Sequence, residues 1–354
     1  MRTRTRLLTA TIAVLSLLAT ACSRADEGGD STEAAAQDKG PAAELRLGYF
    51  PNVTHAPALI GLEKGLFEKE LGDTKLTRQE FNAGPNEVAA LLGGSLDIGF
   101  IGSGPSINAY AKSKGEAVRL ISGVTSGGAQ LVVKPDIKTA ADLAGKTVVT
   151  PQLGNTQDVS LKKWLSENDL TGKVEVTNME NAQTLDAFRG GDVQAAWLPE
   201  PWSSRLVLEA GATVLLDEKT LWPDGQFPTT VVIVRTEFLN EHPETVRGFL
   251  RGLVASIDFA NENKADAQAA VNTQLQALTG KALKPEVIER AWSNITLTFD
   301  PIAGEFKQLA QDQVTAGIAE QAPEVAGFAD LTELNTVLKD AGKPAVDAGG
   351  LDKK

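Results

Sequence analysis

The sequence predicts an α/β protein of two lobes with a helical C-terminal part. Short apolar runs alternate with helical patterns from residue 44 to residue 124, and the same alternation recurs from residue 130 to residue 216. After one more apolar strand at residues 229–235 the pattern becomes almost wholly helical. Alternating strands and helices are typical of α/β proteins with a mainly parallel sheet.

The first block reads as alternating strands and amphipathic helices. We predict strands at residues 45–50, 75–81, 96–101 and 119–124. The first helix, residues 56–70, carries apolar residues at helical spacing. The second, residues 86–92, stops at the Gly93-Gly94 pair. A third is predicted at residues 105–113.

The second block repeats the alternation with shorter elements. We predict strands at residues 130–134, 147–150, 174–177, 195–198 and 213–216. Helices are predicted at residues 139–143, 158–167, 184–189 and 201–209. The helical part is predicted to hold helices at residues 243–261, 265–278, 285–293, 304–318 and 331–338.

The start of the chain has the pattern of an export signal. Arg2, Arg4 and Arg6 precede a short apolar run, and small residues precede Cys22. The run is too short for a permanent membrane span, which needs about 20 residues. Residues 19–22 (ATAC) resemble a lipobox, in which cleavage falls before the cysteine and its thiol carries the lipid. We predict a lipoprotein signal peptide at residues 1–21; an ordinary signal peptide with a chance cysteine is the alternative.

The segment after Cys22 has the composition of a tether. Residues 23–43 contain no large apolar residue, so they cannot bury enough surface to order themselves. We therefore predict a disordered tether at residues 22–43 and a folded body from residue 44 onwards. The protein would be secreted across the plasma membrane and lipid-anchored to its outer face.

Composition excludes several classes of partner. The net charge is −12 at pH 7 with no basic cluster, which argues against nucleic acid and against a protein patch that binds anionic lipid. A single cysteine allows neither an intrachain disulfide nor a thiolate zinc site. His55 and His242 lie far apart in the sequence, so no metal site and no cofactor are predicted.

Five loops rich in Gly, Ser, Pro and Asn mark the predicted site. They are YFPNVTHAP (49–57), GSGPS (102–106), TSGGAQ (125–130), PQLGNTQD (151–158) and WLPEPW (197–202). All except TSGGAQ precede a predicted helix, and none contains lysine or arginine. Helix N-termini offer unpaired N–H groups and a partial positive charge of roughly half a unit. Together the loops predict an anion site without a basic side chain, although turn and cap chemistry alone would use the same residues.

Two of these loops contain residues with more than one interpretation. In WLPEPW each indole could line the cleft or lie in the core of the second lobe. Glu200 could bind a cationic group or brace a hinge, and bracing is the better interpretation. His55 could donate to an anion when protonated, or it could be a solvated or hydrogen-bonded surface group.

Four segments of the chain resemble those of a known family. LRLGYFPNVTHAPALIGLEKGLFEK, FNAGPNEVAALLGGSLDIGFIGSGPSINAY, DLAGKTVVTPQLGNTQDVSLKKWL and FRGGDVQAAWLPEPWSSRLV are similar to segments of ABC-importer solute-binding proteins. The group is that of the aliphatic sulfonate, taurine and nitrate binders, related to the binders of pyrimidine precursors. The resemblance spans roughly residues 44–318 and implies a type II periplasmic-binding fold, with two lobes joined by two crossover strands.

The resemblance also implies domain bounds and site residues. Lobe 1 would comprise residues 44–127 and 230–354, and lobe 2 residues 128–229. The crossings would fall near residues 127–131 and 227–231. The implied ligand-binding residues are Asn52, His55, Ser103, Ser126, Gly127, Asn155, Thr156, Gln157, Trp197, Glu200, Trp202, Phe227 and Thr229. The loops FPNVTHAP and TSGGA depart from the form usual in sulfonate binders, which leaves the ligand open.

We therefore predict a solute-binding lipoprotein of an ABC importer, a monomer that captures a small anionic organic solute by hinge closure. An aliphatic sulfonate or taurine is the predicted class; nitrate, bicarbonate or a thiamine-pyrimidine precursor is the alternative. The chain lacks a GxxxxGK[ST] loop, so permease and ATPase subunits would drive transport. An enzyme of the related pyrimidine-synthase branch is the rival class, but the cysteines of that chemistry are missing and no GxSxG motif is present.

Overall fold

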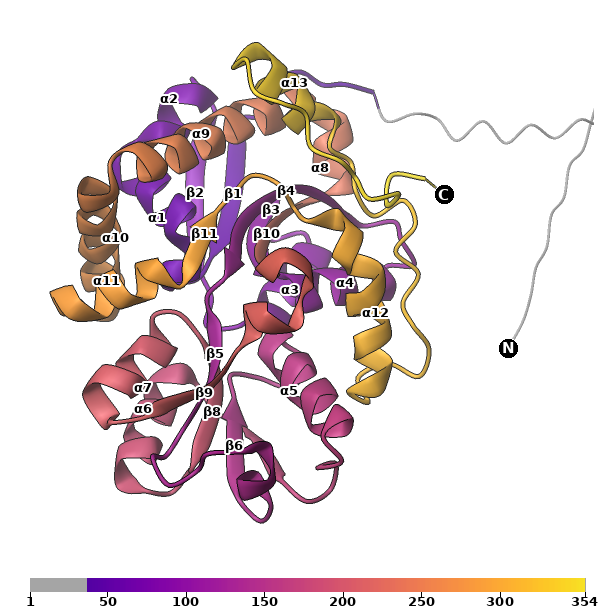
Figure 1. The fold of residues 1–354 in the computed structure, drawn as a ribbon. Helices are drawn as coiled ribbons and strands as arrows, with labels where there is room; N and C mark the ends of the chain where they lie inside the picture. The colour runs from indigo at the N-terminus through magenta and orange to yellow at the C-terminus, as the bar shows by residue number, and fades with distance from the viewer. Residues whose placement is uncertain (1–36, 354) are drawn as a thin grey trace, which may run out of the picture. The chain divides into compact units, whose positions relative to one another are not determined.

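The computed structural model describes residues 37–353, which contain two β-sheets. The six-stranded sheet and the helices packed on it are called lobe 1, and the five-stranded sheet with its helices lobe 2 (Figure 1). The strand order in lobe 1 is β11-β4-β10-β3-β1-β2. Its strands are β1 (Glu44–Tyr49), β2 (Lys75–Glu80), β3 (Ile98–Gly102), β4 (Val118–Gly127), β10 (Pro228–Arg235) and β11 (Ile295–Leu297).

Lobe 2 contains the segment between β4 and β10. Its strand order is β7-β6-β8-β5-β9. The strands are β5 (Ala129–Val133), β6 (Thr147–Thr150), β7 (Glu175–Asn178), β8 (Ala195–Pro199) and β9 (Thr213–Asp217). Three strands of each sheet pair in parallel: β1 pairs with β2 and β3, and β6 pairs with β7 and β8. The strands next to the crossings, β5 and β10, pair antiparallel.

Most predicted helices are present with shifted ends. Those of lobe 1 are α1 (Ala56–Glu63), α2 (Leu66–Leu71), α3 (Gly84–Leu92), α4 (Ser103–Lys112), α8 (Thr236–Glu241), α9 (Pro243–Glu262), α10 (Lys264–Thr279), α11 (Pro285–Ser293), α12 (Phe306–Thr315) and α13 (Thr332–Asp340). Those of lobe 2 are α5 (Thr156–Glu167), α6 (Asn181–Gly190) and α7 (Trp202–Ala210). The single helix predicted at residues 56–70 is divided at Gly65, whose φ of 65° is left-handed. The short elements α8 and β11 were not predicted.

Aromatic rings join the helices of lobe 1 to its sheet. Phe67 of α2 stacks on Phe249 of α9 with ring centroids 5.1 Å apart, and Phe100 of β3 meets both rings edge-on. All three side chains are fully buried. The long helix α9, one of whose faces is apolar as predicted, therefore packs α1 and α2 against the sheet.

The sheet of lobe 2 is buried on both faces, and its residues alternate between them. On β8, Ala195 and Trp197 belong to the apolar cluster under α5, whereas Ala196 and Leu198 belong to the cluster on the opposite face. This alternation follows from the two-residue period of a strand. It places Trp197 in the core, where its ring meets Trp164 of α5 edge-on at 6.3 Å.

The folded body begins earlier than the predicted residue 44. The Lys39 N–H donates to the Glu241 carbonyl at 2.8 Å, and its ammonium pairs with the Glu241 carboxylate at 2.6 Å. The Ala42 N–H donates to Thr245 Oγ1 at 2.8 Å, and Ala42 is buried. Residues 39–43, assigned to the tether from the sequence, therefore lie on lobe 1. The predicted signal peptide and Cys22 lie outside the described residues.

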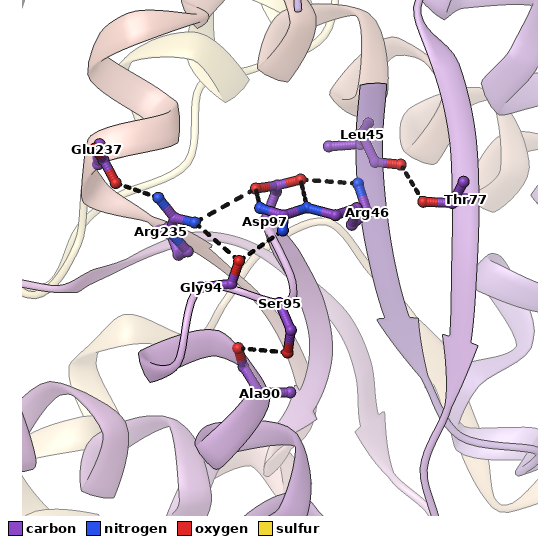
Figure 2. A network of polar contacts seen from close by, with 9 residues as sticks. All are labelled: Leu45, Arg46, Thr77, Ala90, Gly94, Ser95, Asp97, Arg235 and Glu237. Carbon is purple, nitrogen blue, oxygen red and sulfur yellow. Dashed lines mark hydrogen bonds and ion pairs between the residues drawn. The ribbon is translucent and has the colours of Figure 1, made fainter. Parts of the chain in front are cut away.

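An ion network ties β1, β3 and β10 together at one end of the lobe 1 sheet (Figure 2). Asp97, which immediately precedes β3, is buried and accepts from Arg46 Nε at 2.8 Å and from the Arg46 backbone N–H at 2.9 Å. Arg235, the last residue of β10, lies 3.7 Å from the same carboxylate and also pairs with Glu237. No helix within residues 37–353 is both long and apolar enough to cross a membrane.

Candidate functional site

A small cavity lies where the two lobes meet, at the carboxyl ends of β1, β3, β6 and β8. Its volume is about 30 Å³, more than the roughly 10–15 Å³ that one water molecule needs by this measure. The wall contains neither Asp, Glu, Lys nor Arg among the described residues. The lining residues are Phe50, Asn52, Thr54, His55, Asn82, Ala83, Gly84, Gly102, Pro105, Pro151, Asn155, Thr156, Gln157, Asn181, Pro199, Thr229 and Thr230.

A wider hollow of about 290 Å³ adjoins the cavity. The two share Asn82, Ala83 and Pro151. Met179 and Glu180 of lobe 2 help to line the hollow. A solute whose head group fills the cavity therefore has room for a short further portion.

Five helix N-termini surround the cavity. Asn52 and His55 stand at the start of α1, Gly84 at that of α3 and Gly102 at that of α4. Asn155 caps α5, and Asn181 is the first residue of α6. Unpaired N–H groups and the positive ends of the helix dipoles are thus directed at one small space from both lobes. The arrangement can stabilise an anion without a formal positive charge.

The start of α5 is held in place by a buried carboxylate. Asp158 accepts from the Gly154 N–H at 2.9 Å, from Thr150 Oγ1 at 3.0 Å and from Lys162 Nζ at 2.8 Å. Asn155 caps the helix, since its Oδ1 accepts from the Asp158 N–H at 2.9 Å. The PQLGNTQD loop therefore has a defined shape, and it brings Asn155, Thr156 and Gln157 to the cavity wall.

Glycines let the start of α4 approach lobe 2 closely. A Cβ on Gly102 would collide with Thr156 Oγ1, and the Gly104 N–H donates to that oxygen at 3.2 Å. Ser103 is fully buried at the first position of α4, and its Oγ has no hydrogen-bond partner in the described structure. It stands beside the cavity without lining it. The GSGPS loop thus forms an inter-lobe contact as well as a wall.

His55 is neutral, contrary to the charged role considered from the sequence. Its side chain stacks on Phe50 with centroids 4.5 Å apart, and its Nδ1 accepts from the Phe50 N–H at 3.3 Å. Burial lowers the pKa of His55 from 6.5 to about 3. A surface-exposed histidine is excluded as well, because only 2% of the residue is exposed.

The residues of WLPEPW have three different positions. Trp197 is a core residue of lobe 2 and does not line the cavity. Glu200 is fully buried outside the cavity; Arg290 Nη1 lies 3.3 Å and Asn294 Nδ2 2.6 Å from its Oε1. It therefore occupies the bracing position that was preferred from the sequence. Trp202 does not line the cavity either, but its Nε1 donates to Asn52 Oδ1 across the lobes at 3.0 Å.

The two crossing segments lie side by side. The Gly127 N–H donates to the Phe227 carbonyl at 2.9 Å, and the Phe227 N–H donates to Ser126 Oγ at 3.1 Å. Gly127 and Gly128 have left-handed φ values of 71° and 82°, which favour glycine. Ser126, Gly127 and Phe227 thus belong to the hinge and not to the wall, whereas Thr229 lines the cavity.

Six predicted residues therefore converge on the cavity: Asn52, His55, Asn155, Thr156, Gln157 and Thr229. Sequence reasoning missed Asn82 and Asn181, because the helices that follow them were predicted to begin at residues 86 and 184. Pro85 sits in the first turn of α3 and was the available signal for an earlier start. No group of three or more His, Cys, Asp or Glu residues between residues 37 and 353 could hold a metal ion.

Comparison with known families agrees with this architecture. Residues 38–275 match the NMT1-like family, more than half of the chain. The chain belongs to the NMT1-like family. This assignment accounts for both lobes, since the matched residues include β1 to β10.

Relatives of the chain are named for the solutes that they bind. The chain is 29% identical over 201 residues to the taurine-binding periplasmic protein of Escherichia coli K12; the match covers 56% of this chain and 61%, less than two thirds, of that protein. It is 24% identical to a putative aliphatic sulfonates-binding protein of Bacillus subtilis 168, over 84% of this chain and 89% of that one.

Solved structures show the same fold as this NMT1-like protein. The alkanesulfonate-binding protein SsuA from Xanthomonas axonopodis pv. citri has a TM-score of 0.68 at 22% identity, covering 80% of this chain and 95% of that one. The periplasmic nitrate-binding protein NrtA from Synechocystis PCC 6803 has a TM-score of 0.70 at 14% identity, covering 86% and 90%. The type II periplasmic-binding fold expected from the sequence is thereby confirmed.

Proposed function

We propose that this chain is the extracytoplasmic solute-binding subunit of an ABC importer and captures a small anionic organic solute, an aliphatic sulfonate or taurine. The observation that carries the proposal is the cavity between the lobes, surrounded by helix N-termini and free of charged side chains. The names of its NMT1-like relatives support the same class of solute.

The electrostatics of the cavity favour an anion over a cation or a neutral solute. N–H groups and helix dipoles supply positive potential, and no carboxylate in the wall opposes it. A buried solute exchanges water for fixed donors, which stabilise a negative charge more strongly than they do a neutral group. Since the enclosed volume is about 30 Å³, the anionic head group is the part that would be enclosed.

The adjoining hollow favours a solute with an organic portion. Its volume of about 290 Å³ exceeds what nitrate or bicarbonate would use, and Met179 contributes apolar surface. Nitrate, bicarbonate and a pyrimidine precursor remain the second candidates, because relatives named for bicarbonate and nitrate share the family or the fold.

The binding role is non-enzymatic in this proposal. The cavity wall holds one histidine, which is neutral, and neither a carboxylate nor a cysteine. Capture would be a reversible closure of the two lobes around the solute. The proposal also includes export of the chain and lipidation at Cys22, which would attach the protein as a monomer to the outer face of the membrane. Its partners there would be the permease and ATPase subunits of the importer.

A ligand screen followed by calorimetry tests the function. Ethanesulfonate, taurine, nitrate and a pyrimidine are added to the purified protein, and a solute that binds the folded state raises its melting temperature. Asn155→Ala should then weaken binding of the best ligand by about tenfold, because it removes the cap that holds the donors of α5. Ser103→Ala, at the start of α4, should also weaken it.

Asn168→Ala is the matched control. Asn168 follows the other end of α5, where its Nδ2 donates to the Trp164 carbonyl at 2.8 Å. It lies outside the cavity wall, so its loss should leave affinity unchanged. If none of the anions binds, or if both site variants bind as tightly as the unmodified protein, the proposed function at this cavity is refuted.

A further inference from the structure

The hydrogen-bond partners behind the cavity wall decide which atoms its side chains can offer to a ligand. A carboxamide or a neutral imidazole has both a donor and an acceptor. When an N–H group outside the cavity binds the acceptor, that bond fixes the orientation of the group and leaves its donor available to the cavity. Several side chains of this wall are held in this way.

Asn52 is the first of them. The Trp202 Nε1–H can only donate, and it lies 3.0 Å from Asn52 Oδ1. The oxygen of the carboxamide is therefore engaged by lobe 2. The NH₂ group is left for the cavity that Asn52 lines.

His55 is the second. The backbone N–H of Phe50 can only donate, so the His55 Nδ1 that it meets at 3.3 Å carries no proton. Because the buried ring is neutral, its single proton sits on Nε2. Stacking on Phe50 fixes the plane of the ring, and the imidazole offers a donor.

Asn155 and Gln157 form a relay of the same kind. The Asp158 N–H occupies Asn155 Oδ1 at 2.9 Å, so the nitrogen of that amide is the group that meets Gln157 Oε1 at 3.3 Å. Gln157 is therefore left with its NH₂ group as well. One obligate donor in the backbone of α5 thus sets the orientation of both amides.

Resting on the proposed function, we propose that Asn52, His55, Asn155 and Gln157 make this cavity select oxyanion head groups that carry no proton. A sulfonate presents three acceptor oxygens to these donors. A monoprotonated phosphonate must turn an O–H toward N–H groups, which leaves both donors unpaired. Specificity then depends on groups outside the wall that fix the orientation of the wall side chains. Trp202 is a positioning residue of this kind, because its N–H holds the oxygen of the Asn52 carboxamide.

Other wall residues are less constrained. Asn82 lines both the cavity and the adjoining hollow. Asn181 Oδ1 is buried without a hydrogen-bond partner among the described residues, so no donor fixes the orientation of this amide. Thr229 donates its hydroxyl proton to the Gly127 carbonyl at 2.5 Å and so keeps lone pairs. Thr54, Thr156 and Thr230 also line the cavity, and their hydroxyls can donate as well as accept. The four fixed donors therefore set the preference.

The test compares ethanesulfonate with ethylphosphonate by calorimetry at about pH 5, below the second pKa of about 6 that is typical of a phosphoryl group, so that the phosphonate head group keeps one proton. We expect ethanesulfonate to bind at least about tenfold more tightly. Raising the pH removes the proton from ethylphosphonate and should tighten its binding, while ethanesulfonate should bind with constant affinity. Both of these measurements use the unmodified protein.

Trp202→Phe then frees Asn52 Oδ1 while keeping a ring at the position. The affinity ratio of sulfonate to monoprotonated phosphonate should fall by about threefold or more, because the Asn52 amide can turn. A merely structural loss would lower both affinities equally. Trp222→Phe, at a half-buried indole outside the cavity wall, should leave the ratio unchanged.

The outcomes separate the two proposals. If neither anion binds and the ligand screen also finds no other anion that binds, the proposed function is overturned together with the selectivity. The proposed selectivity is overturned if both anions bind with similar affinity or if the protonated phosphonate binds more tightly. It is also overturned if Trp202→Phe leaves the ratio of the two affinities unchanged. In these cases the proposed function remains.

Discussion

His55 shows how burial changes the role of a single side chain. The residue is 2% exposed, and burial lowers its pKa from 6.5 to about 3. At any pH between these values the unfolded chain binds a proton on His55 that the folded chain does not. Stability due to this group therefore rises with pH from about 3 to 6.5 and is lost on acidification.

Ligand binding should accordingly show no histidine titration. We expect the affinity for ethanesulfonate to stay constant between about pH 5 and pH 8, because the imidazole remains neutral throughout. Calorimetry at several pH values measures this. An affinity that rises by about tenfold per pH unit below 6.5 would show that His55 binds the anion as a cation, contrary to the structure.

The sequence could predict the hydrogen-bonding chemistry of the site residues but not how deeply each side chain is buried. The residue types of FPNVTHAP and GNTQD indicate hydrogen bonding to an anion, and the structure places Asn52, His55 and Asn155 at one cavity. Trp197 and Trp202 flank the same turn in the sequence. Only the strand register places Trp197 in the core and leaves Trp202 near the cavity.

At the scale of elements, the Asp97 network fixes three strands at the end opposite the cavity. Asp97 precedes β3, whereas Gly102 at the other end of that strand lines the cavity. Arg46 of β1 and Arg235 of β10, the strands on either side of β3, both pair with the buried Asp97 carboxylate (Figure 2). The ion network and the proposed ligand site thus lie at different ends of one sheet.

Asp97→Asn should therefore lower stability without changing affinity. Removing one partner of a buried ion pair leaves the other charges uncompensated and costs about 3–5 kcal/mol. Urea unfolding measures the loss, with Asp258→Asn as the control. Asp258 pairs with Lys343 near the surface, where an ion pair is worth about 0–1 kcal/mol. Equal losses in the two variants would contradict this assignment.

Elements with a strong period were predictable, and short ones were not. The apolar face of α9 is regular over five turns, and its predicted end differs by one residue from the observed Glu262. The three residues of β11 carry no period, and the strand exists because it pairs with β4. The helix starts at Gly84 and Asn181 were placed too late, so their contribution to the cavity was missed.

At the scale of the whole molecule, contacts near the crossings hold the lobes together. Glu200 of lobe 2 meets Arg290 and Asn294 at α11, and Arg290 Nη2 also donates to Gln130 Oε1 at 2.8 Å. On the cavity side, the backbone N–H of Val53 donates to the Glu200 carbonyl at 3.1 Å. These bonds stabilise the arrangement in which the cavity is enclosed.

Arg290→Ala should weaken ligand binding although Arg290 lies outside the cavity wall. The enclosed state loses contacts between the lobes, so a larger share of the binding free energy is spent on closure. We expect about a tenfold loss of affinity by calorimetry. Arg251→Ala, whose partners Glu70 and Glu244 lie on the same lobe, should have no effect. Equal affinities in the two variants would exclude a role of Arg290 in closure.

The docking of Lys39 on lobe 1 has a mechanical consequence. The chain enters lobe 1 at Lys39 and returns to it at Pro228, so lobe 2 is continuous with the rest of the body only through the two crossings. If the proposed lipid anchor at Cys22 holds the chain from its amino end, lobe 1 is the half fixed to the membrane and lobe 2 the half that moves. In that proposal, the partner permease would detect the filled state as a changed orientation of lobe 2 relative to lobe 1.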